Sequence, residues 1–251
     1  MDVSRALSRI SVVLARTSHP GNIGAAARAM KTMGFSDLVL VAPRHFPDPD
    51  ATAMAAGAAD LLANARVVDS LEAALADRTL AVGFSTRSRG RSHPVAALRE
   101  IAPSLLGASA GGGVALVFGN ETSGLSNEEL ARCQRLAAIP ANPDYPSLNL
   151  AAAVQVACYE LAATASAFGL PASGAGAAAT GDDLRGLFEH LERATLASGF
   201  IDPAKPGQFM ERMRRLFART GLERAEVKLI RGMLDAFEKK MRHSHEGGNP
   251  G

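Results

Sequence analysis

The chain of 251 residues has no tryptophan, only two tyrosines and only two cysteines. Without tryptophan, no indole ring can serve as a stacking platform for a nucleic-acid base. Cys133 and Cys158 are far apart in the sequence, so we interpret them as reduced thiols of a cytoplasmic protein. There is no run of eighteen apolar residues, and the first residues lack the long apolar segment of a secretory signal. Neither a membrane span nor export is therefore expected.

Several common ligand-binding motifs are also missing. The sequence contains neither the dinucleotide-binding pattern G-x-G-x-x-G nor the P-loop pattern G-x-x-x-x-G-K-[ST], which argues against nicotinamide and ATP chemistry. The six histidines show no metal-ligand spacing with cysteines or carboxylates, so we expect no metal site. No Ser-His-Asp order stands out, which argues against acyl transfer.

Positive charge is concentrated near the C-terminus. Residues 207–242 hold ten Lys/Arg and five Asp/Glu, a local charge of +5, whereas the rest of the chain has −3. A basic segment on a nearly neutral body suits a polyanionic partner, although a solvated helix face would show the same pattern. Arg212, Arg215 and Arg219 share one face of a predicted helix and are candidates for contacting such a polyanion.

Short apolar runs alternate with helical patterns over residues 10–168, which predicts an α/β domain whose parallel sheet is covered on both faces. Strands are expected at 10–15, 38–42, 66–68, 79–84, 113–118 and 135–139, and helices at 23–34, 51–64, 70–77, 95–106 and 126–133. Ser126 and Glu129 have the spacing of a capping box, which favours the last of these helices.

The second half of the chain suggests a separate helical part. Residues 1–168 form the expected α/β domain, and 169–181, rich in Gly, Ala and Ser, the expected linker. Residues 182–242 form a helical extension with helices near 182–198, 205–219 and 223–241, and 243–251 is expected to be a disordered tail. The apolar face of the middle helix is formed by Phe209, Met213, Leu216 and Phe217.

Polar and small residues gather where predicted strands end. In 17–34, Gly21, Asn22 and Gly24 would let a polyanion approach the start of a helix, and Gly24, Arg28 and Lys31 share one stripe of it. The packing face of that helix would comprise Ile23, Ala26, Ala27 and Met30. A surface Arg28 with a solvated head remains the alternative for this segment alone.

Two further strand exits carry candidate groups. In 84–93 (FSTRSRGRSH), Arg87, Arg89 and Arg91 alternate with small residues, which suits either phosphate binding or a solvated basic loop. In 118–126 (FGNETSGLS), Gly119 permits unusual backbone angles and is followed by the polar pair Asn120 and Glu121.

The fourth segment, 139–160 (IPANPDYPSLNLAAAVQVACYE), joins a Pro- and Asn-rich loop to a long helix of small apolar residues. Ser147 is the expected helix N-cap and Asn149 would lie in the first turn. Because the helix is apolar nearly all round, we expect it to be buried as core and as a dimer contact.

Together, in this order, SHPGNIGAAARAMKTMG (18–34), LVFGNETSGLSNEEL (116–130) and the segment 139–160 resemble the three signature motifs of the SPOUT-class RNA 2′-O-ribose methyltransferases. Within their TrmH-like branch, the chain is most similar to the bacterial TrmJ type of tRNA methyltransferase. The likeness includes VGFSTRSR (82–89) and the helical extension, so it covers nearly the whole chain.

The resemblance implies a SPOUT fold with a parallel sheet and a C-terminal trefoil knot, a rare exception to ordinary chain topology. It also implies S-adenosyl-L-methionine as cofactor, a homodimer, and tRNA as substrate, methylated on the ribose of nucleotide 32 in the anticodon loop. The implied cofactor pocket comprises Phe84, Ser85, Thr86, Gly119, Ile139, Pro146, Ser147 and Leu148. The implied catalytic residues are Arg28, Asn22, Glu121, Ser147 and Asn149, and Arg89 falls in a loop expected to meet RNA.

Arg28 matches the key catalytic residue of the family. Because arginine is effectively always protonated, we expect it to stabilise the developing alkoxide and hold a neighbouring phosphate rather than act as a base. Three alternatives stay open: an RNA-binding protein of the same fold without catalysis, the same chemistry at another tRNA position or on ribosomal RNA, and a different small-molecule α/β enzyme. Phe84, where a smaller residue is common, and Pro146 depart from the family pattern.

Overall fold

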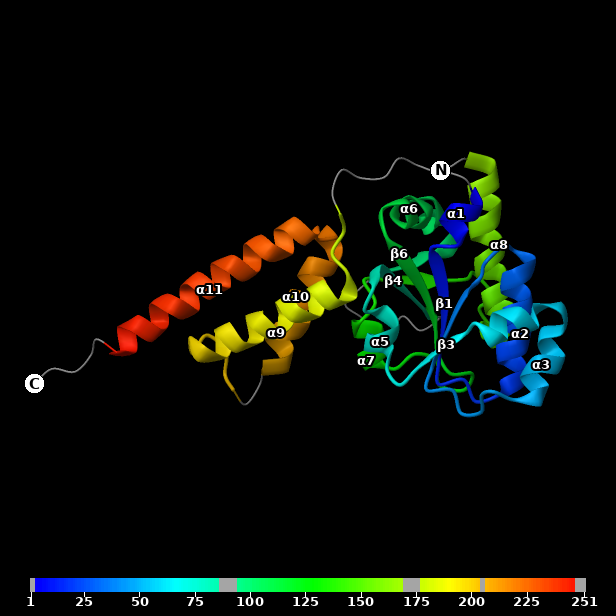
Figure 1. Cartoon of the computed structure of the whole chain (residues 1–251), viewed down its shortest axis with the longest axis horizontal. Helices are drawn as coiled ribbons and strands as arrows, with labels where there is room; N and C mark the ends of the chain where they lie inside the picture. The colour runs from blue at the N-terminus through cyan, green and yellow to red at the C-terminus, as the bar shows by residue number, and fades with distance from the viewer. Residues whose placement is uncertain (1–2, 86–93, 169–176, 204–205, 247–251) are drawn as a thin grey trace, which may run out of the picture. The chain divides into compact units, whose positions relative to one another are not determined.

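The computed structural model describes residues 3–85, 94–168, 177–203 and 206–246. The chain divides into two compact units, Met1–Ala175 and Gly176–Gly251, which are considered separately. The first unit is the α/β part, and the second consists of the C-terminal helices (Figure 1).

Within the described residues, seven strands form one sheet in the order β3-β2-β1-β6-β4-β7-β5, and every pair in it is parallel. The strands are β1 Ile10–Ala15, β2 Asp37–Val41, β3 Arg66–Val68, β4 Arg78–Phe84, β5 Val95–Ala97, β6 Gly113–Phe118 and β7 Arg135–Ala138. The predicted parallel sheet is therefore confirmed. The predicted helix 95–106 is partly wrong, because its first three residues pair with β7 as an edge strand before α6 (Leu98–Gly111) begins.

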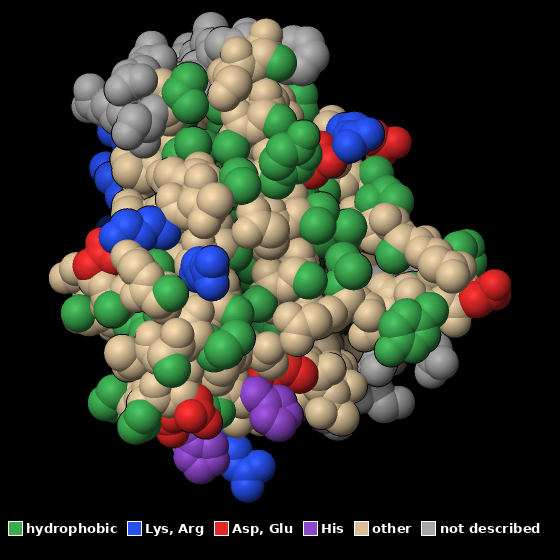
Figure 2. All heavy atoms as spheres, turned by 90° about the vertical axis from the view of Figure 1, so that its right-hand side faces the viewer, with side chains coloured by type: hydrophobic (Ala, Val, Ile, Leu, Met, Phe, Trp, Pro, Cys, Tyr) green, Lys and Arg blue, Asp and Glu red, His purple; other side chains and the backbone are tan. Residues whose placement is uncertain are grey.

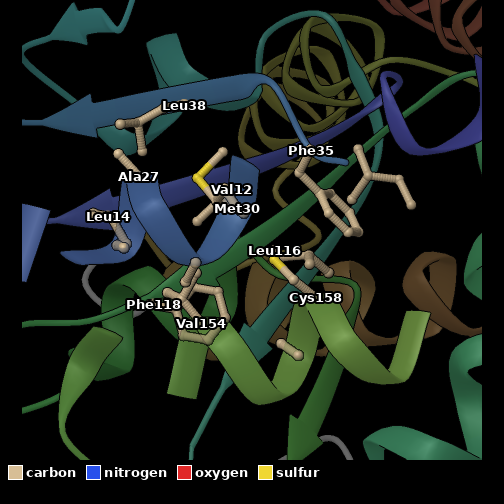
Figure 3. Packing of buried hydrophobic residues seen from close by; sticks show 14 of the residues in the cluster. Val12, Leu14, Ala27, Met30, Phe35, Leu38, Leu116, Phe118, Val154 and Cys158 are labelled. Carbon is tan, nitrogen blue, oxygen red and sulfur yellow. The ribbon is translucent and has the colours of Figure 1, made fainter. Parts of the chain in front are cut away.

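Helices cover both faces of this sheet, as expected. One face is covered by α1 (Val3–Leu7), α2 (Pro20–Thr32), α3 (Pro49–Ala55), α4 (Ala59–Ala63), α6 and α8 (Leu150–Phe168), and the other by α5 (Leu71–Leu75) and α7 (Asn127–Ala131). Figure 3 shows Met30 of α2 and Val154 and Cys158 of α8 among strand residues of the larger core. Strand side chains alternate between the two cores, which is why β1 and β6 are apolar throughout.

Helix α2 packs closely on α3. The predicted packing face of α2 (Ile23, Ala26, Ala27 and Met30) is fully buried. Gly24 belongs to that contact as well, because a Cβ there would lie 2.0 Å from the carbonyl oxygen of Ala51. Gly24 therefore serves the close packing of α2 on α3 rather than the expected approach of a polyanion. The predicted helix 51–64 is interrupted, since Ala56 has φ +48 and a short 3-10 turn (Ala56–Ala58) separates α3 from α4.

Helix α8 is only partly covered. Val154, Ala157, Cys158 and Leu161 are fully buried, which confirms the expected core role, but Tyr159 is 55% exposed. The dimer contact expected for this helix stays a prediction. By length and composition, α8 is the one helix of the described residues that could cross a membrane. Helix α8 packs against α2 and the sheet, so its apolar composition is explained by its place in the hydrophobic core.

The second unit contains α9 (Gly181–Ala197), α10 (Pro206–Thr220) and α11 (Arg224–Glu246) around a small core of its own. The end of the predicted linker is structured, since Ala179 N–H donates to the Leu222 carbonyl at 2.8 Å. Thr180 forms a capping box with Asp183 at the start of α9. Helix α11 continues to Glu246, beyond the expected start of a disordered tail at residue 243. Leu216, which was expected on the apolar face of α10, is 51% exposed. Met210, which was not expected on that face, is buried.

Candidate active site

Glu121 is the centre of a hydrogen-bond network at the carboxyl ends of β1 and β6. Its Oε2 accepts from the backbone N–H and the hydroxyl of Ser18, at 3.0 and 2.8 Å. Its Oε1 accepts from the backbone N–H of His19 at 3.2 Å and from Asn22 Nδ2 at 2.9 Å. The loop after β6 is thereby tied to the start of α2, which directly follows β1.

These donors set the protonation state of Glu121. Partial burial alone would raise the pKa of this carboxyl, but the hydrogen bonds from Ser18 and Asn22 outweigh it and lower the pKa to about 2. Glu121 is therefore a carboxylate at neutral pH. An ionised oxygen that accepts two donors is a strong anchor for both of them.

Asn149 extends the network to the start of α8. Its Nδ2 donates to Asn22 Oδ1 at 3.0 Å, while its Oδ1 accepts from the backbone N–H groups of Ala151 and Ala152 at 2.9 and 3.3 Å. Asn149 is thus the N-cap of α8, and the expectation that Ser147 caps the helix is wrong. The reason is that α8 begins at Leu150, which places Ser147 two residues too early to reach the free N–H groups.

The loop from Gly119 to Ser126 is folded tightly against itself. A Cβ on Gly119 would lie 2.1 Å from the carbonyl carbon of Gly124, so only glycine fits there. Asn120 Nδ2 donates to the Arg16 carbonyl at 2.7 Å. The Arg16 guanidinium in turn pairs with Glu129 through two hydrogen bonds of 2.9 and 2.6 Å. The predicted capping box of Ser126 and Glu129 is present.

This loop forms one wall of a cavity of about 160 Å³. The opposite walls come from the ends of β4 and β7 and from the loop that leads into α8. Phe84 and Phe118 stack beside it with ring centroids 4.3 Å apart. The lining residues are Phe84, Ser85, Phe118, Gly119, Asn120, Glu121, Thr122, Ser123, Gly124, Leu125, Ala137, Ala138, Ile139, Pro146, Ser147, Leu148, Leu150 and Ala153.

The cavity gathers seven of the eight residues expected to form the cofactor pocket. They are Phe84, Ser85, Gly119, Ile139, Pro146, Ser147 and Leu148. The eighth, Thr86, lies outside the described residues, as do Arg87, Arg89 and Arg91 of the basic loop. Of the expected catalytic residues, Asn22, Glu121 and Asn149 are joined by hydrogen bonds, and Ser147 faces the same cavity as Glu121.

Arg28 is not part of this network. It lies on the exposed side of α2, six residues after Asn22, and its guanidinium has no hydrogen-bond or ion-pair partner among the described residues. Lys31, on the same helix, is paired with Asp60 at 2.7 Å. In the helical unit Arg212 and Arg219 are exposed, whereas Arg215 is half-buried and lies 3.9 Å from Glu211.

Sequence reasoning missed Ser18 and Phe118. Ser18 supplies two of the four hydrogen bonds to Glu121; it lies inside the singled-out segment 17–34 but was given no role there. Phe118 is the last residue of β6 and was predicted as a strand end, but it was not included in the expected pocket. Its position before Gly119, at a strand end where α/β proteins bind ligands, was the available signal.

Two family models match the chain. The SpoU rRNA Methylase family matches residues 9–159, and the model for the tRNA methyltransferase TrmJ C-terminal domain matches residues 182–246. The chain belongs to the SpoU methylase family, and its C-terminal part is of the TrmJ type. The resemblance seen in the sequence is thereby confirmed.

Individual relatives agree with this assignment. The tRNA (cytidine/uridine/adenosine-2′-O-)-methyltransferase TrmJ of Pseudomonas aeruginosa is 48% identical over 94% of this chain and 96% of its own length. The tRNA (cytidine/uridine-2′-O-)-methyltransferase TrmJ of Klebsiella pneumoniae is 46% identical over 93% and 98%. The crystal structure of TrmJ from Z. mobilis superposes with a TM-score of 0.79 at 31% identity, covering 91% of this chain and 98% of that chain.

Proposed function

We propose that the protein transfers a methyl group from S-adenosyl-L-methionine to a ribose 2′-OH of tRNA, at nucleotide 32 of the anticodon loop. The observation that carries the proposal is the cavity between the ends of β4, β6 and β7, next to the network of Asn22, Glu121 and Asn149. The TrmJ relatives, which match over more than nine-tenths of the chain, are named as tRNA 2′-O-methyltransferases.

The residues around the cavity fit this cofactor. Ile139, Leu148 and the edge of the Phe84–Phe118 stack offer apolar surface to a flat adenine ring. Asn120, Ser123 and Ser147 offer polar groups to the ribose and the amino-acid end. When bound, the sulfonium would supply the methyl group, whose bond to sulfur breaks as a bond to the ribose oxygen forms and the hydroxyl proton is lost.

The protein's own contribution would be positioning and electrostatics. Glu121 and Asn22 fix the start of α2 against the cavity wall, and Asn149 fixes the start of α8 against Asn22. Holding the reacting groups in place can lower a barrier by several kcal/mol, on the order of the effects known for well-oriented reactants. Arg28 would stabilise the developing alkoxide and hold an RNA phosphate.

The C-terminal helices would hold the tRNA backbone through Arg212, Arg215 and Arg219, together with Arg87, Arg89 and Arg91 of the first unit. This part of the proposal rests on the local positive charge and on the exposure of Arg212 and Arg219. Because Arg215 is half-buried, it would contribute less to tRNA binding than Arg212 and Arg219.

We further propose that the first unit contains the family's trefoil knot and that the protein acts in the cytoplasm as a homodimer. The dimer contact would use the uncovered side of α8. On the side of the first unit where α2, α3 and α8 lie, hydrophobic side chains spread over the centre and most charged ones lie toward the margin (Figure 2). Light scattering coupled to size-exclusion chromatography tests the dimer, and a monomer at micromolar concentration contradicts it.

The reaction itself is tested by methyl transfer from labelled S-adenosyl-L-methionine to total tRNA, followed by nuclease digestion and mass spectrometry. We expect a 2′-O-methyl nucleoside at position 32 that is absent with Arg28→Ala. Arg28→Lys is the matched control, because it keeps the charge but lacks the guanidinium fork, and full turnover by it contradicts a fork-specific role. Cofactor binding without transfer to tRNA would redirect the proposal to ribosomal RNA. If neither cofactor binding nor methyl transfer is observed, an RNA-binding protein without catalysis is favoured.

A further inference from the structure

The helical unit contains a cluster of ionisable side chains for which the proposed reaction has no use. His190 lies on α9, and Asp235 and Glu238 lie on α11. The side chain of His190 is only 3% exposed, and neither of its ring nitrogens has a hydrogen-bond partner among the described residues. Burying such a group without a partner is unfavourable, so the cluster calls for a ligand or a proton.

The distances within the cluster favour a metal ligand set. His190 Nε2 lies 3.4 Å from Asp235 Oδ1 and 3.6 Å from Glu238 Oε1. These separations are longer than ordinary hydrogen bonds. Around a tetrahedral zinc ion with bonds of about 2.0–2.2 Å, ligand atoms lie roughly 3.3–3.6 Å apart. All three ligand atoms of the cluster fall within 4.8 Å of one another.

We propose that His190, Asp235 and Glu238 bind a divalent transition-metal cation, with Zn²⁺ as the best fit, and so join α9 to α11. Asp235 and Glu238 are three residues apart on one helix and therefore share a face. A neutral imidazole with two carboxylates is a ligand set that zinc accepts, and it leaves a fourth position for water. The ligands stand 45 and 48 positions apart in the sequence, so no local spacing could have revealed them.

Arg193 provides a further test of the proposal, because its guanidinium would compete with the metal for an oxygen of Glu238. Its Nε lies 3.2 Å from Glu238 Oε1, the same oxygen that faces His190. Removing the guanidinium frees that oxygen and lowers the local positive charge. Arg193→Gln should therefore tighten metal binding several-fold, whereas a cluster that only forms ion pairs would gain nothing from the change.

The test uses the full chain after treatment with a chelator and dialysis. Titration with Co²⁺, followed by its visible absorption, and calorimetry with Zn²⁺ should show one saturable site per chain and a rise in Tm with Zn²⁺. Cys133 and Cys158 do not compete, since burial raises the pKa of each thiol to about 12.

His190→Gln and Glu238→Gln should each raise the Kd for the metal at least tenfold. The side chain of Asp235 is 71% exposed and so tolerates change. Asp235→Asn should therefore also raise the Kd for the metal, without affecting the fold. Glu189→Gln and the double change His243→Asn with His245→Asn are controls that should leave the site intact. The proposal is overturned if the wild type shows no site with one-to-one stoichiometry, if Asp235→Asn and Glu238→Gln bind normally, or if only the double control loses binding.

Discussion

Replacing Glu121 by glutamine should destabilise the first unit by about 2 kcal/mol. The glutamine oxygen can still accept from His19 and Asn22. The new NH₂ group, however, faces the backbone N–H of Ser18, which then has no acceptor. Leaving one partly buried donor unsatisfied costs about 1–3 kcal/mol. The Ser18 hydroxyl can rotate and accept, so it adds little to that cost.

The pKa of Glu121 supports the same magnitude. A shift from 4.5 to about 2 corresponds to at most roughly 3 kcal/mol. Because the carboxyl is only partly buried, solvent screening reduces this to about 1–2 kcal/mol. The folded-state pKa lies below the unfolded value, so the stabilisation is complete above about pH 4.5 and is lost as the pH falls toward 2.

Differential scanning calorimetry at neutral pH should show the transition of the first unit lowered by about 4–8 °C, since each kcal/mol shifts Tm by about 2–4 °C at this size. The difference from wild type should shrink below pH 4.5. Glu100→Gln on α6 is the matched control, because it removes the same charge from an exposed side chain that accepts no hydrogen bond from a described residue. Equal Tm values for the two variants at neutral pH would refute the reasoning.

Three further outcomes are expected. Gly119→Ala should cost at least roughly 2 kcal/mol and abolish cofactor binding by calorimetry, because its Cβ meets backbone atoms that cannot rotate away; normal binding would contradict the tight loop. Asn149→Ala should cost about 1 kcal/mol in denaturant unfolding through loss of the α8 cap, while Ser147→Ala should not; equal effects would reject this assignment of the cap. Affinity for tRNA should fall steeply with salt, and replacing Arg212 and Arg219 by alanine should lower the slope by about 1–2; a flat salt response would exclude a backbone grip.

The sheet could be predicted closely because buried parallel strands are continuous apolar runs. The run 10–15 is β1 with the same bounds, and 113–118 is β6. Interruptions were harder to predict. Ala56 adopts a left-handed φ of +48 between two alanine-rich helices, and nothing in its local composition signals this. Leu216 has the right spacing for the apolar face of α10, yet Met210 takes the buried position. Only packing against α9 and α11 decides between them.

The place of the site was predictable, but its hydrogen bonds were not. Parallel strands end at one edge of the sheet, so the exits of β1, β4, β6 and β7 had to meet there. Which side chains and backbone groups form hydrogen bonds at that edge could not be predicted. Two of the four donors to Glu121 are backbone N–H groups about a hundred residues away, which no residue pattern can reveal.

This pairing also constrains the chemistry. A general base that works near neutral pH needs a pKa near 7, because a much weaker base is ionised but has little tendency to take a proton. Glu121 has a pKa of about 2, and four hydrogen bonds already occupy its oxygens. To accept the proton of a ribose hydroxyl, it would have to give up the contacts that hold the start of α2. Glu121 is therefore suited to holding Asn22 and the cavity wall in place, and the 2′-OH proton must leave by another route.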